Sequence, residues 1–343
     1  MVCMTADGQP QRRAAVALVA ALGLLAGCAS SPSAGGGTRP IELVELEAPL
    51  THAAWATEVD ALLGLTAEDR LLEIDPDTGE TAYSLQLKST GENLAVVTRP
   101  SEHVYVPQPD FDRIAVIGTK SLERIRDLGA GQTPHWVASH PTSFTLLAIS
   151  EDGSTVTGVD TETHEVSFRQ QVAGGPAAVV AEAGDSLDPA FWLVGPGRVA
   201  HFAGKQPTPT ADRTGELSHE TFSPDRDTPE AAYLTEEGSS RVVALEGQQG
   251  ELAGVAEQDL GEPVEHVESK AKEEFRVYAA TASSLTVLRS DNLERLDTIE
   301  FRSVLDQAGL GGARIGGLTV GDSHIYLGVE GEPYVLRIRK PAE

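Results

Sequence analysis

Histidine recurs at one position of a repeated sequence pattern. In two copies it stands 12 residues before a large apolar residue, as His135 does before Leu147 and His266 before Tyr278. The residues that share this position are His52, Asn93, His135, His219, His266 and Arg314. Imidazole nitrogens bind zinc and titrate near neutral pH, and a guanidinium group binds anions. The pattern therefore predicts one polar site assembled from distant parts of the chain.

Two interpretations of this shared position remain open. In the first, His135, His219 and His266 are ligands of a divalent metal such as zinc, which takes nitrogen ligands in tetrahedral geometry. In the second, the same side chains form a hydrated polar lining that holds no metal. Arg314 disfavours a bound cation and suits an anion.

The sequence lacks the motifs of the common catalytic classes. It contains no Gly-x-Ser-x-Gly, His-Glu-x-x-His, Walker, Gly-x-Gly-x-x-Gly or Cys-x-x-Cys pattern. We therefore assign no catalytic residue and expect a non-enzymatic binding or scaffold protein. The alternatives are a metal-binding accessory protein and a hydrolase that uses a metal or histidine, with Glu220 or Glu265 as proton acceptor.

Short β-strands must position these residues. Alternating apolar residues separated by polar turns predict antiparallel hairpins, most clearly at residues 103–117, 276–288 and 325–336. The copies recur about every 40 to 47 residues, the size of a four-stranded propeller blade. We expect an all-β, seven-bladed β-propeller over residues 41–343, with a six- or eight-bladed ring as the main alternative. Because the innermost strands line the central channel, the shared position would lie at one mouth of that channel.

The ends of this domain are expected to pair with each other. The last unit supplies three strands before the chain stops, and the alternating segment Ile41–Glu47 precedes the first unit. An N-terminal strand that completes the last blade would remove the open edge of the ring. The sequence thus predicts that residues 41–47 close the last blade.

Several of these segments resemble bacterial YVTN-type propellers, close to the lactonase-like propellers. The resemblance rests on residues 104–108 followed by 114–117, on 133–138 and on 159–163. It covers most of the domain, although the Tyr-Val-Thr-Asn motif is Tyr-Val-Pro-Gln here. It implies the propeller fold and says little about activity.

The N-terminal segment predicts export and a lipid anchor. Arg12 and Arg13 precede an apolar run from Ala14 to Ala26, the layout of a secretory signal. The ending Leu-Ala-Gly-Cys resembles the lipobox of bacterial lipoproteins, which implies that Cys28 is lipidated and becomes the new N-terminus. We expect a signal peptide at residues 1–27 and a flexible Gly/Ser/Pro tether at 28–40. The domain would then be extracytoplasmic and anchored to the bacterial cell membrane.

Composition limits the partners of the domain. The net charge is −26, which disfavours binding to nucleic acid and favours solubility, cations or a basic partner. The only cysteines are Cys3 and Cys28, so the mature domain holds no disulfide. We expect the partners to be the lipid bilayer, through Cys28, and a protein or small ligand at the channel face.

Overall fold

A computed structural model describes most of the region that follows residue 40. The described residues are 41–97, 102–140, 143–172, 178–181, 190–195, 197–204, 208–214, 219–225, 230–270 and 274–341. They belong to one compact unit, residues 39–343. The predicted signal peptide, tether and lipid site Cys28 lie outside the described residues.

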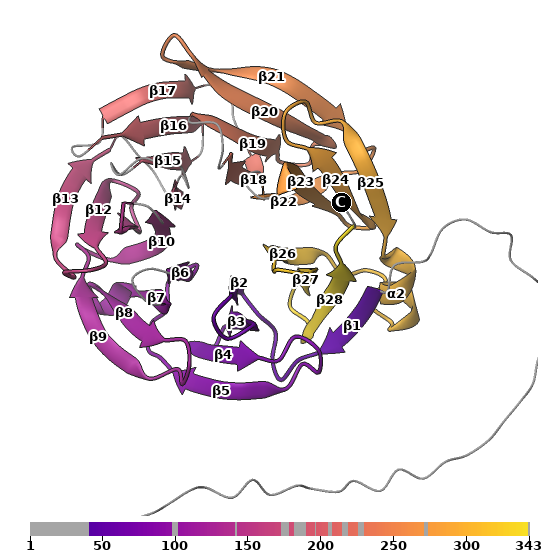
Figure 1. Cartoon of the computed structure of the whole chain (residues 1–343), viewed down its shortest axis with the longest axis horizontal. Helices are drawn as coiled ribbons and strands as arrows, with labels where there is room; N and C mark the ends of the chain where they lie inside the picture. Colours follow the sequence, from indigo (N-terminus) through magenta and orange to yellow (C-terminus); the bar gives the residue numbers. More distant parts are fainter. Residues whose placement is uncertain are drawn as a thin grey trace, which may run out of the picture. The chain divides into compact units, whose positions relative to one another are not determined.

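The unit is a β-propeller whose sheets are arranged around a central axis (Figure 1). The first sheet contains β2 (His52–Ala56), β3 (Ala61–Leu65), β4 (Arg70–Ile74) and β5 (Thr81–Gln86). The second contains β6 (Ala95–Val97), β7 (His103–Gln108), β8 (Arg113–Gly118) and β9 (Arg124–Gly129). The third contains β10 (Pro134–His140), β11 (Thr145–Ser150), β12 (Thr155–Asp160) and β13 (Val166–Gln171). The sheet before the last contains β22 (Val264–Lys270), β23 (Arg276–Thr281), β24 (Ser284–Arg289) and β25 (Arg295–Glu300).

One sheet is larger than the others and corrects the expected count of seven blades. Its strands are β14 (Ala178–Ala181), β15 (Ala190–Gly195), β16 (Arg198–Ala203), β17 (Thr208–Thr214), β18 (His219–Pro224), β19 (Ala231–Glu236), β20 (Arg241–Gln248) and β21 (Glu251–Asp259). Two four-stranded meanders join here because their outer strands β17 and β21 pair in parallel at Asp212 and Glu251. The described strands therefore form six hydrogen-bonded sheets, five of four strands and one of eight.

The closing sheet joins the two ends of the unit. It contains β26 (Ile315–Val320), β27 (His324–Val329), β28 (Tyr334–Arg339) and β1 (Ile41–Glu45). β1 pairs antiparallel with β28 from Ile41 opposite Ile338 to Glu45 opposite Tyr334, and Val44 and Leu46 are buried. The predicted closure by the N-terminal strand is thus confirmed, and it removes the free edge of the ring.

Burial explains the alternation of polar and apolar strands. The second and third strands of most sheets are largely buried on both faces, as in β3 and β4, because a neighbouring sheet packs on either side. The core is a series of clusters between sheets, such as Leu63 and Leu71 against Val104 and Ile117. The outer strands β5 and β9 are largely exposed and polar. The tyrosines that mark the second strands, Tyr105, Tyr233, Tyr278 and Tyr326, are all buried.

Helical structure is minor in the described part of the chain. A 3-10 turn, η1 (Pro109–Phe111), follows β7, and the short helix α2 (Arg302–Gln307) packs Leu305 onto the closing sheet. Within the described residues, no helix is both long and apolar enough to cross a bilayer.

Candidate functional site

The innermost strands place the candidate residues around the central axis. β2, β6, β10, β14, β18, β22 and β26 face the centre (Figure 1). Each candidate lies within two residues of the start of one of them. His52 begins β2, His219 begins β18, and Arg314 directly precedes β26. The candidates therefore lie near the same ends of the inner strands, but they do not share one register. A β-bulge falls at His135 in β10, whereas in β22 the bulge falls at Glu265, one residue before His266.

Asn93 serves as a bridge between the second and third sheets. Its Nδ2 donates to the carbonyl of Val137 at 2.8 Å, and its Oδ1 accepts from the amide of Val137 at 2.8 Å. Asn93 is buried, as is Val137. The amide side chain therefore replaces the missing strand partner of Val137, which explains why an asparagine suits this position.

His266 and Arg314 take part in a second bridge, between β22 and β26. The Nε2 atom of His266 lies 3.0 Å from the carbonyl oxygen of Ile315. The neighbouring carboxylate of Glu265 accepts from the amide of Ile315 at 2.8 Å and from Nε of Arg314 at 3.2 Å. Because Glu265 is buried and held by these donors, we interpret it as a link between sheets rather than a proton acceptor.

His52 lies against an aromatic side chain from another sheet. Its ring meets Trp136 of β10 edge to face, with the ring centroids 6.3 Å apart. Burial, and then the positive charge that His266 can carry, lower the pKa of His52 to about 4. The imidazole is therefore neutral at pH 7 and can both donate and accept a hydrogen bond.

His135 connects to the second sheet at the same end of the ring. Its Nε2 lies 3.2 Å from a carboxylate oxygen of Glu92, and its carbonyl accepts from the amide of Glu92 at 2.9 Å. Its Nδ1 is buried and has no hydrogen-bond partner. This nitrogen is one unsatisfied polar atom at the channel mouth.

The metal hypothesis has no assembled ligand set among the described side chains. No group of three or more His, Cys, Asp or Glu residues is placed to hold a metal ion within that set. His219 pairs through its backbone with Glu236, and its side chain lies outside the described residues. The described geometry therefore favours inter-sheet bonding for Asn93 and His266, and the role of His219 stays a prediction.

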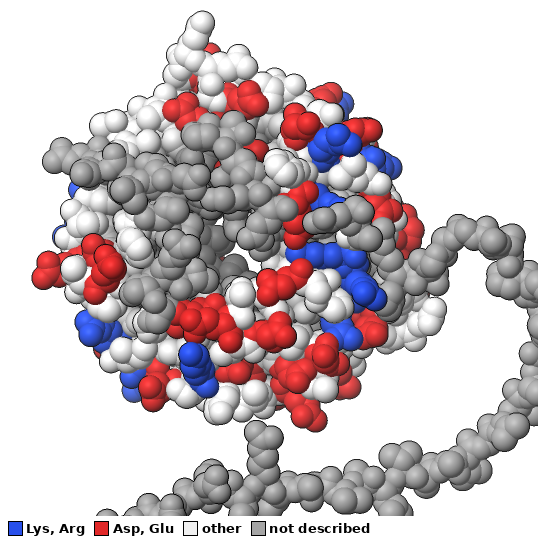
Figure 2. Space-filling model, viewed as in Figure 1, with Lys and Arg blue, Asp and Glu red and all other residues white. Residues whose placement is uncertain are grey.

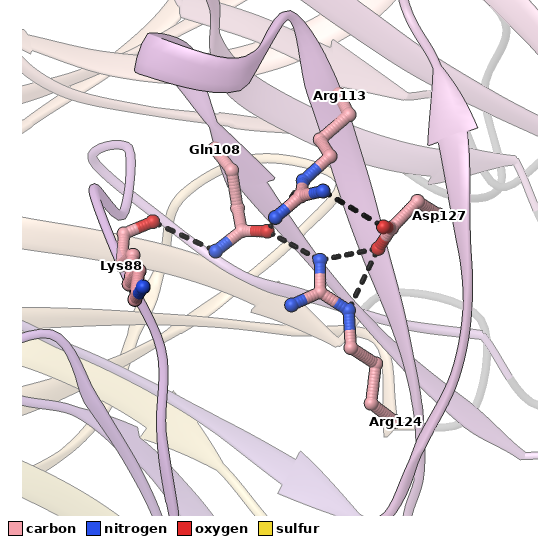
Figure 3. Close-up of polar contacts among 5 residues, drawn as sticks. All are labelled: Lys88, Gln108, Arg113, Arg124 and Asp127. Carbon is pink, nitrogen blue, oxygen red and sulfur yellow. Dashed lines mark hydrogen bonds and ion pairs between the residues drawn. The ribbon is translucent and has the colours of Figure 1, made fainter.

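A polar network that the sequence did not indicate lies within the second sheet (Figure 3). The buried Gln108 accepts from Nε of Arg113 at 3.0 Å and from Nη2 of Arg124 at 2.7 Å, and it donates to the carbonyl of Lys88 at 2.7 Å. Both arginines also bind Asp127. The two guanidinium groups thus fix β7, β8 and β9 to each other, and we interpret this network as structural.

Charge is unevenly distributed over the face drawn in Figure 2. Asp and Glu side chains gather over the sheet β2–β5, and Lys and Arg side chains cluster near β28 and β25. The acidic side of the ring would attract cationic groups, and attraction of this kind weakens as salt concentration rises.

Comparisons with known proteins support the fold. No family model and no curated protein matches the chain. Among solved structures, a chain of the mitotic checkpoint complex aligns with a TM-score of 0.70 at 13% identity, covering 95% of this chain and 99% of that chain. The structure of U3-55K aligns with a TM-score of 0.67 at 11% identity, covering 88% of this chain and 98% of that chain. The WD40 repeats of RRP9 align with a TM-score of 0.66 at 12% identity, covering 90% of this chain and 99% of that chain.

One of these neighbours, RRP9, is described by its WD40 repeats. All three neighbours confirm the all-β propeller fold at identities too low to transfer a function. They lend no support to the more specific YVTN or lactonase-like type that the sequence resembles. What the comparisons support is the β-propeller fold.

Proposed function

We propose that this chain is a membrane-anchored, extracytoplasmic binding protein that holds a protein partner or a small ligand at the channel face of its propeller. The proposal combines the lipobox at Cys28 with the fold of WD40-type scaffolds. It also rests on the absence of catalytic motifs from the sequence.

The observation that carries the proposal is the contact of His52 with Trp136 across the ring. A neutral imidazole beside an indole ring offers a donor, an acceptor and an apolar face to one ligand. The unsatisfied Nδ1 of His135 adds another polar atom at the same end of the inner strands. Binding there would satisfy that atom, which the protein alone leaves without a partner.

Site-specific photo-crosslinking in cells tests the channel face. A photoreactive amino acid replaces the exposed Thr51, next to His52, and a control chain carries it at the exposed Arg126 on the outer strand β9. We expect a discrete adduct, identified by mass spectrometry, from residue 51 and none from residue 126. Equal adducts at both positions, or none at residue 51, would contradict binding at the channel face.

Fatty-acid labelling tests the anchor. Cells that express the wild-type chain or Cys28→Ser are grown with a clickable fatty-acid analogue. We expect label and membrane association for the wild type, and loss of both for the variant. Equal labelling of the two chains would refute a lipid on Cys28.

Zinc titration tests the metal-binding alternative. The wild-type chain is compared with a His219→Ala/His266→Ala double variant. Binding at roughly micromolar zinc that the double variant loses would favour a metal-binding accessory protein. If the wild type does not bind zinc, or if the double variant still binds it, only the interpretation of a hydrated polar lining without metal remains.

A further inference from the structure

A pocket lies at the opposite end of β2 from His52. This pocket has a volume of about 350 Å³ and lies between the first sheet and the closing sheet. Trp55 near the end of β2, Glu73 in β4 and Tyr326 in β27 all line it. Because it opens beyond the last residues of β2, it is separate from the channel mouth that carries the histidines.

Glu73 contributes a buried carboxylate to this pocket. Only 8% of the residue is exposed, and its Oε2 atom has no hydrogen-bond partner. Burial raises the pKa of Glu73. A buried carboxylate without a partner is unfavourable, so its presence requires either a proton or a cationic group bound beside it.

Trp55 and Tyr326 form an aromatic wall. Their rings stack with centroids 5.4 Å apart and planes 11° from parallel. The turn that follows β26 lies directly against them, because a Cβ atom on Gly321 would approach each ring to 3.0 Å. The Nε1 atom of Trp55 is buried and unpartnered, so the wall also offers one free hydrogen-bond donor.

The rim of the pocket is acidic. Asp60, Asp75 and Asp77 all line it. Asp77 and Glu42 form ion pairs with Arg337, which places that cation between two carboxylates. Asp75 accepts from the amide of Asp77 at 2.8 Å within a tight turn.

His324 adds little positive charge to this rim at neutral pH. Burial first, and then the nearby Arg339, lower the pKa of His324. The lining therefore keeps an excess of negative charge around Glu73. Within the described residues, no three of its acidic or imidazole groups are arranged to hold a metal ion, so the geometry fits an organic cation better.

We propose that this pocket binds an organic monocation, an alkylammonium or guanidinium group with a hydrogen-bond acceptor beside it. Glu73 pairs with the positive charge, the Trp55–Tyr326 wall attracts the cation and covers its carbon atoms, and Trp55 Nε1 donates to the acceptor. The site is independent of the channel-face function, because it lies at the other end of β2. The cation belongs to a free amine or to a lysine or arginine side chain of a polypeptide.

Calorimetric titration with small probes tests the proposal. n-Butylammonium and N-methylguanidinium are the cationic probes, and n-butanol is the neutral probe of similar shape. We expect saturable binding of at least one cation at roughly millimolar concentration and much weaker binding of butanol. The amides of acetyl-lysine and acetyl-arginine, which carry the carbonyl acceptor, should bind more tightly than the simple cations if the natural source is a polypeptide. If they bind more weakly, the source is a free amine.

Two variants and one control assign the binding to this pocket. Glu73→Gln keeps the shape and removes the charge, and we expect it to weaken cation binding about tenfold or more. Trp55→Phe should weaken binding of the amide probes more than binding of n-butylammonium. Glu80→Gln removes an exposed carboxylate outside the pocket, on the same turn, and should bind like the wild type.

Thermal unfolding checks that the variants are folded. Glu73→Gln should be at least as stable as the wild type, because it removes an unpartnered buried carboxylate. No saturable binding of either cation, butanol binding as tightly as the cations, or wild-type affinity in a folded Glu73→Gln variant would overturn the proposal. An absence of crosslinked adducts at residue 51 would contradict the channel-face proposal but would not bear on cation binding in this pocket.

Discussion

The bridge made by Asn93 gives the sharpest test of how the propeller is held together. Replacing Asn93 with alanine removes two hydrogen bonds of 2.8 Å to the buried Val137 and leaves its amide and carbonyl without partners. Each unsatisfied buried group costs about 1 to 3 kcal/mol. We therefore expect Asn93→Ala to lower the free energy of unfolding by about 2 to 5 kcal/mol, with several degrees of loss in Tm.

A matched control joins the same two sheets. The hydroxyl of Ser139 donates to the carbonyl of Val96 at 3.3 Å, a single, longer and partly buried bond. Ser139→Ala should therefore cost about 1 kcal/mol or less. Asn93→Asp keeps the shape but sets a carboxylate oxygen against the carbonyl of Val137, so it should be destabilising despite its size.

Denaturant unfolding followed by circular dichroism and by tryptophan fluorescence measures these differences. Agreement of the two signals is needed before one free energy is assigned, since a domain of this size can unfold in stages. An Asn93→Ala variant as stable as Ser139→Ala would refute the reasoning. If Asn93→Ala instead lost ligand binding without losing stability, Asn93 would be a ligand contact.

Two further predictions concern closure and pH. A chain that starts at residue 48 should unfold at a lower denaturant concentration than one that starts at 41, because it exposes the edge of β28 and loses the buried Val44 and Leu46, each worth roughly 2 kcal/mol; equal midpoints would contradict closure by β1. His52 has a pKa of about 4 when folded and 6.5 as its ordinary value, so the unfolded chain binds the extra proton between these pH values. Stability should fall by at most about 3 kcal/mol as pH drops from 6.5 to 4. His52→Gln should remove this part of the pH dependence, and an unchanged pH profile would show that the folded state does not lower the pKa of His52.

The propeller was predictable because it depends on local alternation. Strands such as Arg276–Thr281 and His324–Val329 alternate between turns, and their tyrosines mark the buried second strand of each unit. The closing strand was also predictable, because an orphan strand at Ile41 matches a last unit that lacks one. Turn-forming residues and the alternation of apolar with polar residues specify strands and hairpins over about ten residues. Such local patterns can be recognised directly in the sequence.

The number of sheets was not predictable in this way. The expected seven separate blades become six sheets because Asp212 and Glu251 pair between two outer strands. That contact joins residues of different hairpins. Edge pairing of this kind depends on how neighbouring sheets sit beside one another, which no local pattern encodes.

The sequence by itself determined the strand meanders and the closing strand. Only the tertiary structure decided what the candidate site residues do. A bond between sheets, such as that of Asn93 with Val137 or of Glu265 with Ile315, depends on the partner in space and not on spacing along the chain. The pocket with Glu73 and Trp55 arises in the same way, because it joins the first sheet to the last. Local sequence fixes which residues face inward, whereas the packing of distant sheets fixes which atoms they meet.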